Sequence, residues 1–349
     1  MLDDLAALKR LDPHHAREAL AGFPAQCRAA ARLRPEPALA LRDACRAVVV
    51  VGMGGSAAGG DLVAACAAER ATVPVLVHRG YDLPALAGPE TLVIASSYSG
   101  ETEEVLAAVD MAIRRGCAVA AITAGGALGA LAARHGFPRI TLPGGLMPRM
   151  ALGYLALPGL ALLRAAGVAA VEERELAEAL DVVETLAAEL APERPTDGNE
   201  AKRIARAIGQ RIAVIYGGPV TGGVAYRWKT DMEENAKAFA IAGAIPEMNH
   251  NEIEAWRPGV PPFHLVLLRD EGEAPAIRHR FAILRDLVGP AVQGVSEVWT
   301  RGRGRLARLL SSAYLGQWTS YYSAIVREVD PWTVPILDEI KRRMRDTSR

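Results

Sequence analysis

The chain has 349 residues, 50% of them hydrophobic and 23% charged, which is typical of a folded globular protein long enough for two domains. Its 40 basic and 40 acidic residues cancel, so bulk binding to nucleic acid or to an anionic membrane is not expected. The N-terminus is acidic where a signal peptide needs positive charge. The apolar run that comes closest to a bilayer span, Met150 to Leu163, contains Pro158 and is better explained as a buried core helix. We therefore expect a cytoplasmic protein that does not enter a membrane.

The cysteines all lie in the first third of the chain, without a Cys-x-x-Cys spacing: Cys27, Cys45, Cys66 and Cys117. Such scattered residues are typical of reduced, structural thiols rather than of a disulfide framework or a zinc site. The sequence therefore predicts no metal centre built on cysteine.

The first part of the chain alternates short β-rich runs with helix-like segments. After a helical extension, residues 1–44, the expected strands are Val48–Val51, Val73–Val77, Thr91–Ala95, Ala118–Ile122 and Arg139–Leu142. This alternation is typical of a parallel sheet covered by helices on both faces. We assign it to a first α/β domain, residues 45–191, which ends with a helix over Glu172–Leu190.

The pattern restarts after residues 192–198, whose prolines and glycine cannot continue a helix and mark a linker. The elements expected beyond it are strands Arg211–Tyr216, Phe263–Leu268 and Ala291–Val295, and helices Val224–Asn235 and Leu306–Glu328. We predict a second, smaller doubly wound domain over residues 199–330 and a terminal helix over 331–349. Ligands of such domains bind at the C-terminal ends of the strands.

Two turns of the first domain have the composition of a phosphate site. One is Gly52-Met53-Gly54-Gly55-Ser56-Ala57, and the other runs from Ser96 to Glu104 and contains Ser97, Ser99 and Thr102. Hydroxyls, backbone N–H groups and the positive end of a helix dipole would converge there on one anion. Serine and threonine beside glycine also cap helices, but two such turns in one domain favour a phosphorylated small molecule. Glu101 and Glu103 are expected in the first turn of the following helix, with no catalytic role.

Five motifs occur in order along most of the chain, at 52–57 (Gly-x-Gly-Gly-Ser-Ala), 97–104 (Ser-Tyr-Ser-Gly-x-Thr-Glu-Glu), 148–154 (Pro-Arg-x-Ala-Leu-Gly-Tyr), 233–237 (Glu-Glu-Asn-x-Lys) and 245–252 (Ile-Pro-Glu-x-Asn-His-Asn-Glu). Together they resemble the sugar isomerase (SIS) domain proteins and, more narrowly, the bifunctional phosphoglucose/phosphomannose isomerases. The resemblance implies two flavodoxin-like SIS domains in tandem, a homodimer, and neither a metal nor a nucleotide cofactor. It also implies interconversion of glucose or mannose 6-phosphate with fructose 6-phosphate.

That reaction moves a proton between C1 and C2, so it needs a carboxylate base, an acid/base for ring opening, a cation for the developing oxyanion and a phosphate anchor. The resemblance assigns these tasks to Glu234, His250 and Arg149, with His250 contributed by the partner subunit. It assigns the phosphate to the side chains of Ser56, Ser97, Ser99 and Thr102 and to the backbone of Gly54 and Gly55. Lys341 matches a lysine that reaches the site in the family, but no motif surrounds it and the match is weak.

Each assignment has an ordinary structural alternative. Glu234 lies on a polar helical face that suits solvated charges, as does Lys341. His250 lies in a polar loop, where it is either a surface histidine or a proton shuttle. Arg149, at a strand–helix boundary, could extend along the surface or pair with a surface carboxylate, but its position at the C-terminal end of a strand and the motif match favour a substrate contact.

Three other functions compete with the isomerase. Gly52-x-Gly54-x-x-Ala57 satisfies the dinucleotide fingerprint, but the second strand runs into Arg79 where an acid should hold the ribose, so Arg79 suggests at most a 2′-phosphate. A non-catalytic SIS-type sensor would keep the serines without needing Glu234, His250 and Arg149 together, and no DNA-binding segment is apparent. The third is an SIS isomerase that acts on a heptose, amino-sugar or pentose phosphate. Only the family resemblance distinguishes it from the hexose-phosphate isomerase.

Overall fold

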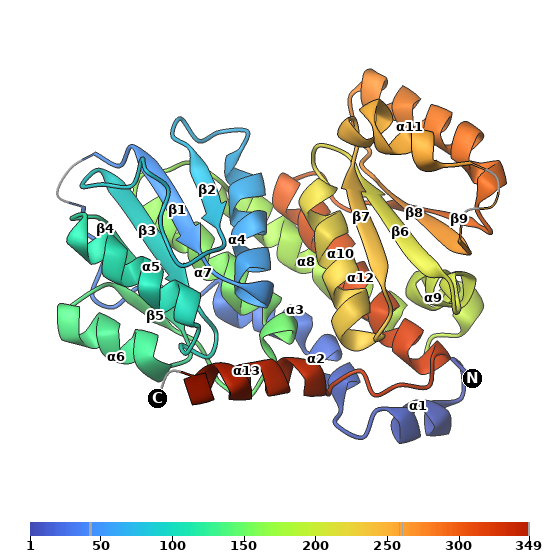
Figure 1. Ribbon diagram of the computed structural model, residues 1–349, viewed down its shortest axis with the longest axis horizontal. Coiled ribbons are helices and arrows are strands. Elements are labelled where there is room, and N and C mark those ends of the chain that lie inside the picture. The colour runs from blue at the N-terminus through green and yellow to red at the C-terminus, as the bar shows by residue number, and fades with distance from the viewer. Residues whose placement is uncertain (42–43, 258, 260, 348–349) are drawn as a thin grey trace. The chain divides into compact units, whose positions relative to one another are not determined.

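The structure of the protein, a computed structural model, describes residues 1–41, 44–257, 259 and 261–347. Residues 42–43 of the predicted extension, 258 and 260 of the predicted second domain and 348–349 of the predicted terminal helix lie outside the described residues. The chain divides into two compact units. The first unit comprises Gly22–Glu184 and Arg301–Ser311, and the second unit comprises Met1–Ala21, Thr185–Thr300 and Ser312–Arg349 (Figure 1). The domain boundaries expected from the sequence stay a prediction.

The first unit contains a parallel sheet with strand order β2-β1-β3-β4-β5. Its strands are β1 (Ala47–Val51), β2 (Val75–His78), β3 (Thr91–Ser96), β4 (Ala118–Thr123) and β5 (Arg139–Thr141). The order is that of a flavodoxin-like, doubly wound fold, as predicted. Strand β2 begins two residues later than expected, because Pro74 has no N–H group to donate to the sheet ladder.

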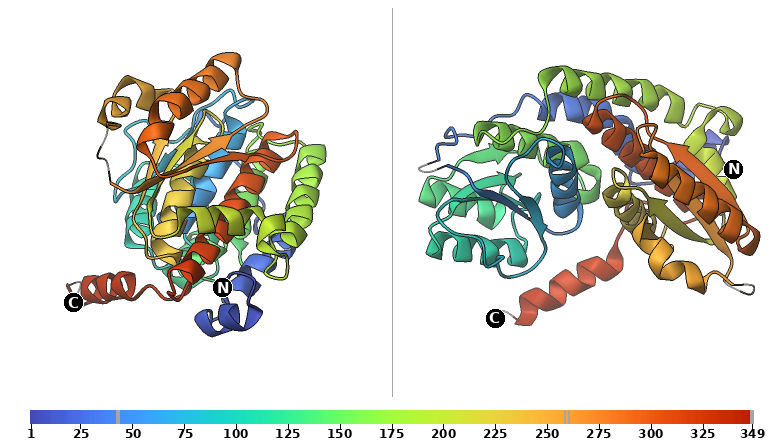
Figure 2. Two further views of the ribbon diagram at one scale, coloured as in Figure 1. Left: turned by 90° about the vertical axis from the view of Figure 1, so that its right-hand side faces the viewer. Right: turned by 90° about the horizontal axis from the view of Figure 1, so that it is seen from above.

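Helices cover both faces of this sheet, as Figure 2 shows from above. They are α3 (Phe23–Ala30), α4 (Gly54–Ala67), α5 (Glu103–Arg114), α6 (Gly126–His135) and α7 (Leu152–Ala165), with a 3-10 turn, η1 (Pro148–Met150), before α7. On one face Val49 and Val93 pack in a cluster with residues of α5 and α6. On the other face α4 packs closely against Val50. The absence of a side chain at Gly60 permits this contact, since a Cβ there would lie only 2.9 Å from the valine side chain. The predicted apolar helix with an internal proline is α7, with Pro158 buried inside it.

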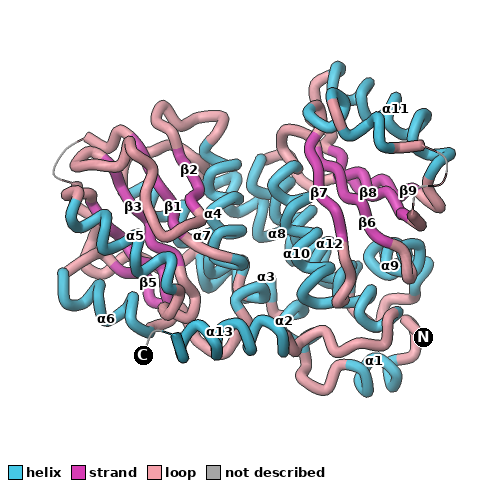
Figure 3. The backbone as a smooth tube through the Cα atoms, in the orientation of Figure 1, coloured by secondary structure: helices cyan, strands magenta, loops and turns pink. Residues whose placement is uncertain are grey.

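The second unit contains a parallel sheet with strand order β7-β6-β8-β9, drawn in magenta in Figure 3. Its strands are β6 (Ile212–Gly217), β7 (Ala240–Ala244), β8 (Phe263–Arg269) and β9 (Val295–Trp299). The sequence did not predict β7, which is a half-exposed edge strand of alanine, isoleucine and glycine. The strand expected at Ala291–Val295 was misplaced: β9 starts where that prediction ends, after the 3-10 turn η5 (Gly289–Ala291).

The remaining helices of the second unit are α1 (Leu5–Leu11), α2 (Ala16–Ala21), α9 (Glu200–Ile208), α10 (Gly222–Asn235), α11 (Pro275–Val288) and α13 (Pro335–Thr347), with 3-10 turns η2 (Thr196–Gly198), η3 (Glu247–His250) and η4 (Glu252–Ala255). The bounds of α8 (Glu173–Leu190) and α12 (Arg305–Val326) confirm the two long helices predicted near those positions. Among the described residues, no helix is long and apolar enough to cross a membrane.

The segment expected to be a linker, residues 192–198, is held in place by the buried side chain of Lys202. The Lys202 ammonium group donates hydrogen bonds to the backbone oxygens of Pro192 at 2.7 Å and Arg194 at 2.8 Å. It also pairs with the Asp3 carboxylate at 3.0 Å, although the Lys202 side chain is fully buried. A buried charge is tolerated only when it is paired and hydrogen-bonded. These contacts therefore fix the path of residues 192–198.

Candidate functional site

The turn after β1 ends at the start of α4. Gly54 has a φ of +50°, a left-handed conformation that favours glycine. A side chain at Gly55 would place its Cβ 2.5 Å from the backbone oxygen of Pro148, so only glycine lets the first turn of α4 approach η1 so closely. The result is a helix N-terminus without bulky side chains, which presents the positive end of its dipole.

The turn after β3 gathers hydroxyl groups in front of α5. The hydroxyls of Ser97 and Thr102 are hydrogen-bonded at 2.7 Å, and the Gly100 N–H donates to the Ser97 oxygen at 3.1 Å. Gly100 has a φ of +75°, and a Cβ there would lie 1.9 Å from the backbone oxygen of Gly125. The glycine in the Ser-Tyr-Ser-Gly motif is thus required by a close backbone approach.

One hydrogen bond joins the two turns. The backbone N–H of Tyr98 donates to the Ser56 hydroxyl at 3.2 Å. Ser56 and Ser97 are buried, whereas Ser99 is exposed and its hydroxyl accepts the Glu101 N–H at 3.2 Å. The structure thus brings together Gly54, Gly55, Ser56, Ser97, Ser99 and Thr102 on two adjoining turns, which we call the hydroxyl cradle. Their role toward a phosphate stays a prediction.

The expectation for Glu101 was wrong. Helix α5 begins at Glu103, so Glu101 precedes the helix and does not belong to its first turn. Its carboxylate instead accepts the Ala127 N–H at 2.9 Å, at the start of α6. Glu101 therefore caps the neighbouring helix, where its negative charge meets the positive end of a different dipole. Glu103 is in the first turn of α5, as predicted.

Arg149 is buried, with 2% of its surface exposed, on η1 beside the start of α4. Its guanidinium therefore does not extend freely into solvent, and its role toward the substrate stays a prediction. The turn that carries Arg149 is held by Gln26 of α3, whose amide donates to the Met150 oxygen at 2.9 Å and accepts the Gly153 N–H at 2.7 Å. The segment that leads to this turn is held by Tyr98, whose hydroxyl donates to the Pro143 oxygen at 2.8 Å and accepts the Leu146 N–H at 3.1 Å. Arg149 thus lies in the same unit and next to the same helix N-terminus as the hydroxyl cradle.

In the second unit, Glu234 lies half-buried near the C-terminal end of α10. Its neighbour Glu233 pairs with Lys229 at 2.8 Å. The end of the helix is fixed by Lys237, which donates to the Glu234 backbone oxygen at 2.9 Å and to the Asp330 oxygen at 2.6 Å. The structure thus fixes the backbone around Glu234, and its role as the base stays a prediction.

His250 is exposed and ends the 3-10 turn η3. The neighbouring Met248 is buried in the core cluster of the second unit, together with Ile245. The loop therefore turns its histidine outward while its apolar residues anchor it. This placement is compatible with both expectations for His250.

Lys341 is exposed on α13, so its predicted contact with a substrate gains no support within its own unit. The same helix exposes a row of large apolar residues: Ile336, Leu337, Ile340 and Met344. Spacings of three and four residues place them on one face of the helix. An apolar face of this kind usually marks an interaction surface.

Arg79 does not support the dinucleotide alternative. Its guanidinium pairs with Asp61 of α4 at 2.5 Å. A residue engaged in this way within the fold is not presented to a 2′-phosphate. Among the described residues, no group of three or more His, Cys, Asp or Glu side chains is placed to hold a metal ion.

Sequence reasoning missed Gln26 and Tyr98 as supports of the site. Gln26 acts across 124 residues on Met150, and Tyr98 acts across 45 residues on Pro143. Nothing in the local pattern around Gln26 marks it. Tyr98 lies within the serine motif at 97–104, and that position was the only feature of the sequence that could have indicated its role.

Comparison with known proteins agrees with this architecture. Residues 41–135 match the family model of the SIS domain, and residues 197–344 match that of the bacterial phospho-glucose isomerase C-terminal SIS domain. A bifunctional phosphoglucose/phosphomannose isomerase from Caldicellulosiruptor bescii is 38% identical, over 86% of this chain and 89% of that relative. One from Thermoplasma acidophilum is 32% identical, over 85% and 89%.

Among solved structures, a glucose-6-phosphate isomerase like protein from Thermus thermophilus has a TM-score of 0.65 and 21% identity, over 96% of this chain and 99% of that one. At that identity the likeness concerns the fold alone. The fold and the matched models define a protein with two SIS domains. The identity to the curated relatives is decisive, and the chain belongs to the bifunctional phosphoglucose/phosphomannose isomerase family.

Proposed function

We propose that the protein interconverts glucose 6-phosphate and mannose 6-phosphate with fructose 6-phosphate, by a proton transfer through an enediol that needs no metal. Membership of the isomerase family supports the reaction. The observation that carries the proposal is the Tyr98–Ser56 hydrogen bond, because it joins two helix-start turns rich in hydroxyls into one anion site.

In this proposal the hydroxyl cradle binds the substrate phosphate. Ser99 is the exposed hydroxyl at the tip of its turn and contacts the phosphate oxygens directly. Ser56 and Ser97, whose oxygens already accept backbone N–H groups, hold the two turns in place and orient their remaining donors. Gly54 and Gly55 supply backbone N–H groups at the start of α4.

The proton transfer is assigned to Glu234. Its carboxylate removes the proton from C2 of the aldose and returns it to C1 of the enediol, and the reverse transfer converts the ketose. His250 exchanges a proton between the ring oxygen and the hydroxyl at C1, which opens the pyranose. Arg149 stabilises the negative charge that develops on oxygen during enolisation.

We also propose that the working protein is a homodimer in which a second copy covers the apolar face of α13 and contributes His250 to the site. Mixing the inactive variants Glu234→Gln and His250→Ala tests this directly. If each site combines Glu234 of one chain with the partner's histidine, random pairing restores about a quarter of the wild-type activity. If the mixture shows no detectable activity, the shared site is contradicted.

A cytoplasmic location completes the proposal. Cys27, Cys45, Cys66 and Cys117 are all free thiols. Burial raises the pKa of Cys66 to about 12 and raises that of Cys27 as well, so both are unreactive. Free, buried thiols suit a reducing compartment.

The deciding experiment is a coupled assay on EDTA-treated protein, with glucose 6-phosphate and mannose 6-phosphate supplied separately. Formation of fructose 6-phosphate from both is the expected result. Glu234→Gln should abolish turnover while retaining sugar-phosphate binding, and the matched variant Glu233→Gln, which breaks only the pair with Lys229, should remain active. If neither sugar reacts although both bind, the protein is a sensor or an isomerase for a different sugar.

A further inference from the structure

The loop that carries His250 has little regular structure to hold it. Residues 247–255 form the two 3-10 turns η3 and η4, joined at Asn251, which has the unusual backbone angles φ −149° and ψ −71°. An exposed side chain on such a loop keeps its position only through specific contacts with the rigid elements below.

Those contacts converge on Tyr216, a fully buried residue of β6. Its hydroxyl donates a hydrogen bond to the Glu252 carboxylate and accepts one from the Trp256 indole N–H at 3.2 Å. The rings of Tyr216 and Trp256 meet edge to face, with centroids 6.4 Å apart. The buried Tyr216 hydroxyl thus uses both its donor and its acceptor function on residues of the loop. Because Tyr216 belongs to β6, these two hydrogen bonds tie the loop to a rigid strand.

Asn251 connects this anchor to the turn that carries His250. Its side-chain oxygen accepts the Glu252 N–H at 2.6 Å, and its amide group donates to the Glu247 carboxylate at 2.8 Å. Glu247 begins η3 and His250 ends it. The contacts therefore run without interruption from the buried Tyr216 through Glu252 and Asn251 to both ends of the turn.

The polar character of this anchor calls for an explanation. Burying the Tyr216 hydroxyl and partly burying the Glu252 carboxylate costs desolvation energy, and an apolar pair of similar volume would hold a loop at least as stably. Hydrogen bonds, unlike apolar contacts, fix direction. Burial and the neighbouring carboxylate raise the pKa of Tyr216, so its hydroxyl remains a donor throughout the physiological range.

We propose that Tyr216 and Glu252 are positioning residues that fix His250 for ring opening. This inference rests on the proposed function, which gives His250 that task. Loss of the hydrogen bond leaves the substrate phosphate contacts intact, because they are assigned to the hydroxyl cradle. The defect should therefore appear in kcat and not in KM.

The test compares Tyr216→Phe, Glu252→Ala and Glu252→Gln with wild type on glucose 6-phosphate. We expect Tyr216→Phe and Glu252→Ala to lower kcat about tenfold with KM within about twofold, a tenfold loss being about 1.4 kcal/mol in the barrier. Glu252→Gln should recover most of the activity, because an amide oxygen still accepts the tyrosine hydroxyl. Tyr226→Phe, which removes the hydroxyl of an exposed tyrosine of α10, is the matched control and should behave as wild type.

A double-mutant cycle separates positioning from general loss of structure. His250→Ala should lower kcat by about a hundredfold or more. If Tyr216 acts through His250, adding Tyr216→Phe to His250→Ala should lower kcat no further. Additive losses, a raised KM, or full activity of His250→Ala would overturn the inference. Should Tyr216→Phe fail to fold, the same cycle is run with Glu252→Ala, whose side chain is only half-buried. A wild-type protein that isomerises neither hexose phosphate would instead overturn the proposed function.

Discussion

The two units build the same pair of turns and fill them with different side chains. Strand register pairs Val51 with Ala95 in the first sheet and Tyr216 with Leu267 in the second. On this register Ser56 corresponds to Thr221, and loop 97–102 corresponds to loop 269–274, which has the same length. Both pairs of turns lie at the carboxyl ends of the two central strands, where doubly wound folds bind ligands.

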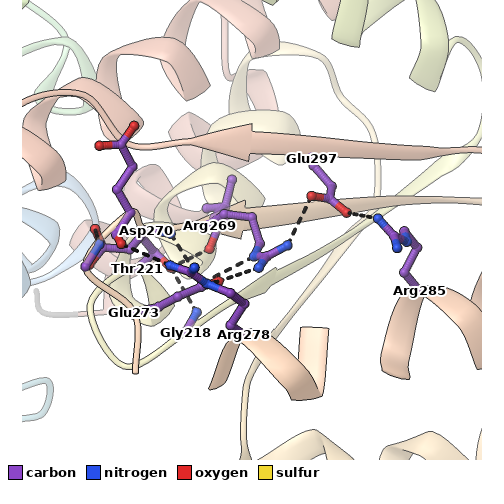
Figure 4. A network of polar contacts seen from close by, with 11 residues as sticks. Gly218, Thr221, Arg269, Asp270, Glu273, Arg278, Arg285 and Glu297 are labelled. Atoms are coloured by element: carbon purple, nitrogen blue, oxygen red, sulfur yellow. Dashed lines mark hydrogen bonds and ion pairs between the residues drawn. The ribbon is translucent and has the colours of Figure 1, made fainter. Parts of the chain in front are cut away.

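In the second unit Thr221 keeps a hydroxyl at the position of Ser56, but two other cradle hydroxyls are replaced by a charged and an apolar side chain. Arg269 stands where the first unit has Ser97, and Ala274 stands where it has Thr102. The Arg269 guanidinium lies between the rings of Phe281 and Trp299, at 4.4 and 4.6 Å. It pairs with Glu273 and, at 3.0 Å, with Glu297 (Figure 4).

The hydroxyl that crosses between the turns also changes its role. Ser56 accepts a backbone N–H from the second turn, whereas Thr221 donates to the Leu268 oxygen at 2.7 Å and accepts the Gly218 N–H at 2.9 Å. The second unit thus satisfies its turns with its own side chains, while the first leaves the Ser99 hydroxyl exposed. The fold provides two candidate anion sites, and a few side chains decide which one remains open.

The largest expected effect comes from Gly100→Ala in the first unit. The new Cβ would clash with the Gly125 oxygen in a left-handed conformation, so we expect a loss of about 5 kcal/mol in the free energy of unfolding and loss of sugar-phosphate binding. Urea unfolding followed by far-UV circular dichroism measures the stability. Gly88→Ala, at a position with no neighbouring atom within 4 Å, is the control, and equal stability of the two variants would contradict the close approach.

Arg269→Ala should separate stability from binding in the opposite unit. Removing the guanidinium leaves the buried Glu273 carboxylate without its main partner, which costs about 4 kcal/mol. The KM for glucose 6-phosphate should not change, because the proposed function assigns the phosphate to the hydroxyl cradle and not to this turn. All five tryptophans lie in the second unit, so tryptophan fluorescence during urea unfolding reports on it. Arg285→Ala, which breaks an exposed pair with Glu297, should have little effect on either quantity. A raised KM in Arg269→Ala would show that the second turn takes part in binding.

The second unit should also be the more sensitive to acid. Burial, with a smaller contribution from Arg211, lowers the pKa of His264 to about 4 from an ordinary 6.5. The unfolded chain therefore binds a proton below pH 6.5 that the folded chain excludes, so stability is complete above 6.5 and declines as the pH falls toward 4. The loss should approach about 3 kcal/mol.

His264→Asn removes this titration while leaving a polar partner for Ser296, whose hydroxyl lies 2.8 Å from the imidazole. The acid-induced decline in tryptophan-monitored stability should then be shallower than in wild type. Parallel pH profiles of the two proteins would assign the acid sensitivity to other groups.

The smallest expected effect comes from Ser99→Ala. This exposed hydroxyl makes only a local hydrogen bond to the Glu101 N–H, so stability should hardly change. Loss of one phosphate contact should raise KM about tenfold, or about 1.4 kcal/mol, with kcat at saturation little altered. Steady-state kinetics with Thr141→Ala, an exposed hydroxyl on β5, as the control would reveal it. An unchanged KM in Ser99→Ala would remove Ser99 from the phosphate site.

Much of the fold followed from periodicity and turn composition. The valine-rich β1 and the alternation of strands with helices predicted both sheets, because burial on both faces leaves a continuous apolar run. The misses were β7 and β9, which form the two edges of the second sheet. Edge strands are half-exposed, so their residues carry a weaker apolar signal.

The site was predictable in its motifs but not in its contacts. Serine and glycine in the two turns were found because strand ends and helix starts restrict which residues fit. The capping of α6 by Glu101 and the support of η1 by Gln26 depend on partners brought close only by the tertiary fold. No local sequence pattern carries that information. A family resemblance identifies candidate site residues but does not identify the contacts that hold them in position.

The buried Lys202 has a practical consequence for anyone who handles this protein. Its ammonium group is neutralised by Asp3, which lies 199 positions earlier in the chain. Trimming the first three residues, or fusing a tag that pulls them away, would leave an unpaired cation in the interior beneath residues 192–198. N-terminal proteolysis should therefore be interpreted as a change to the interior of the second unit.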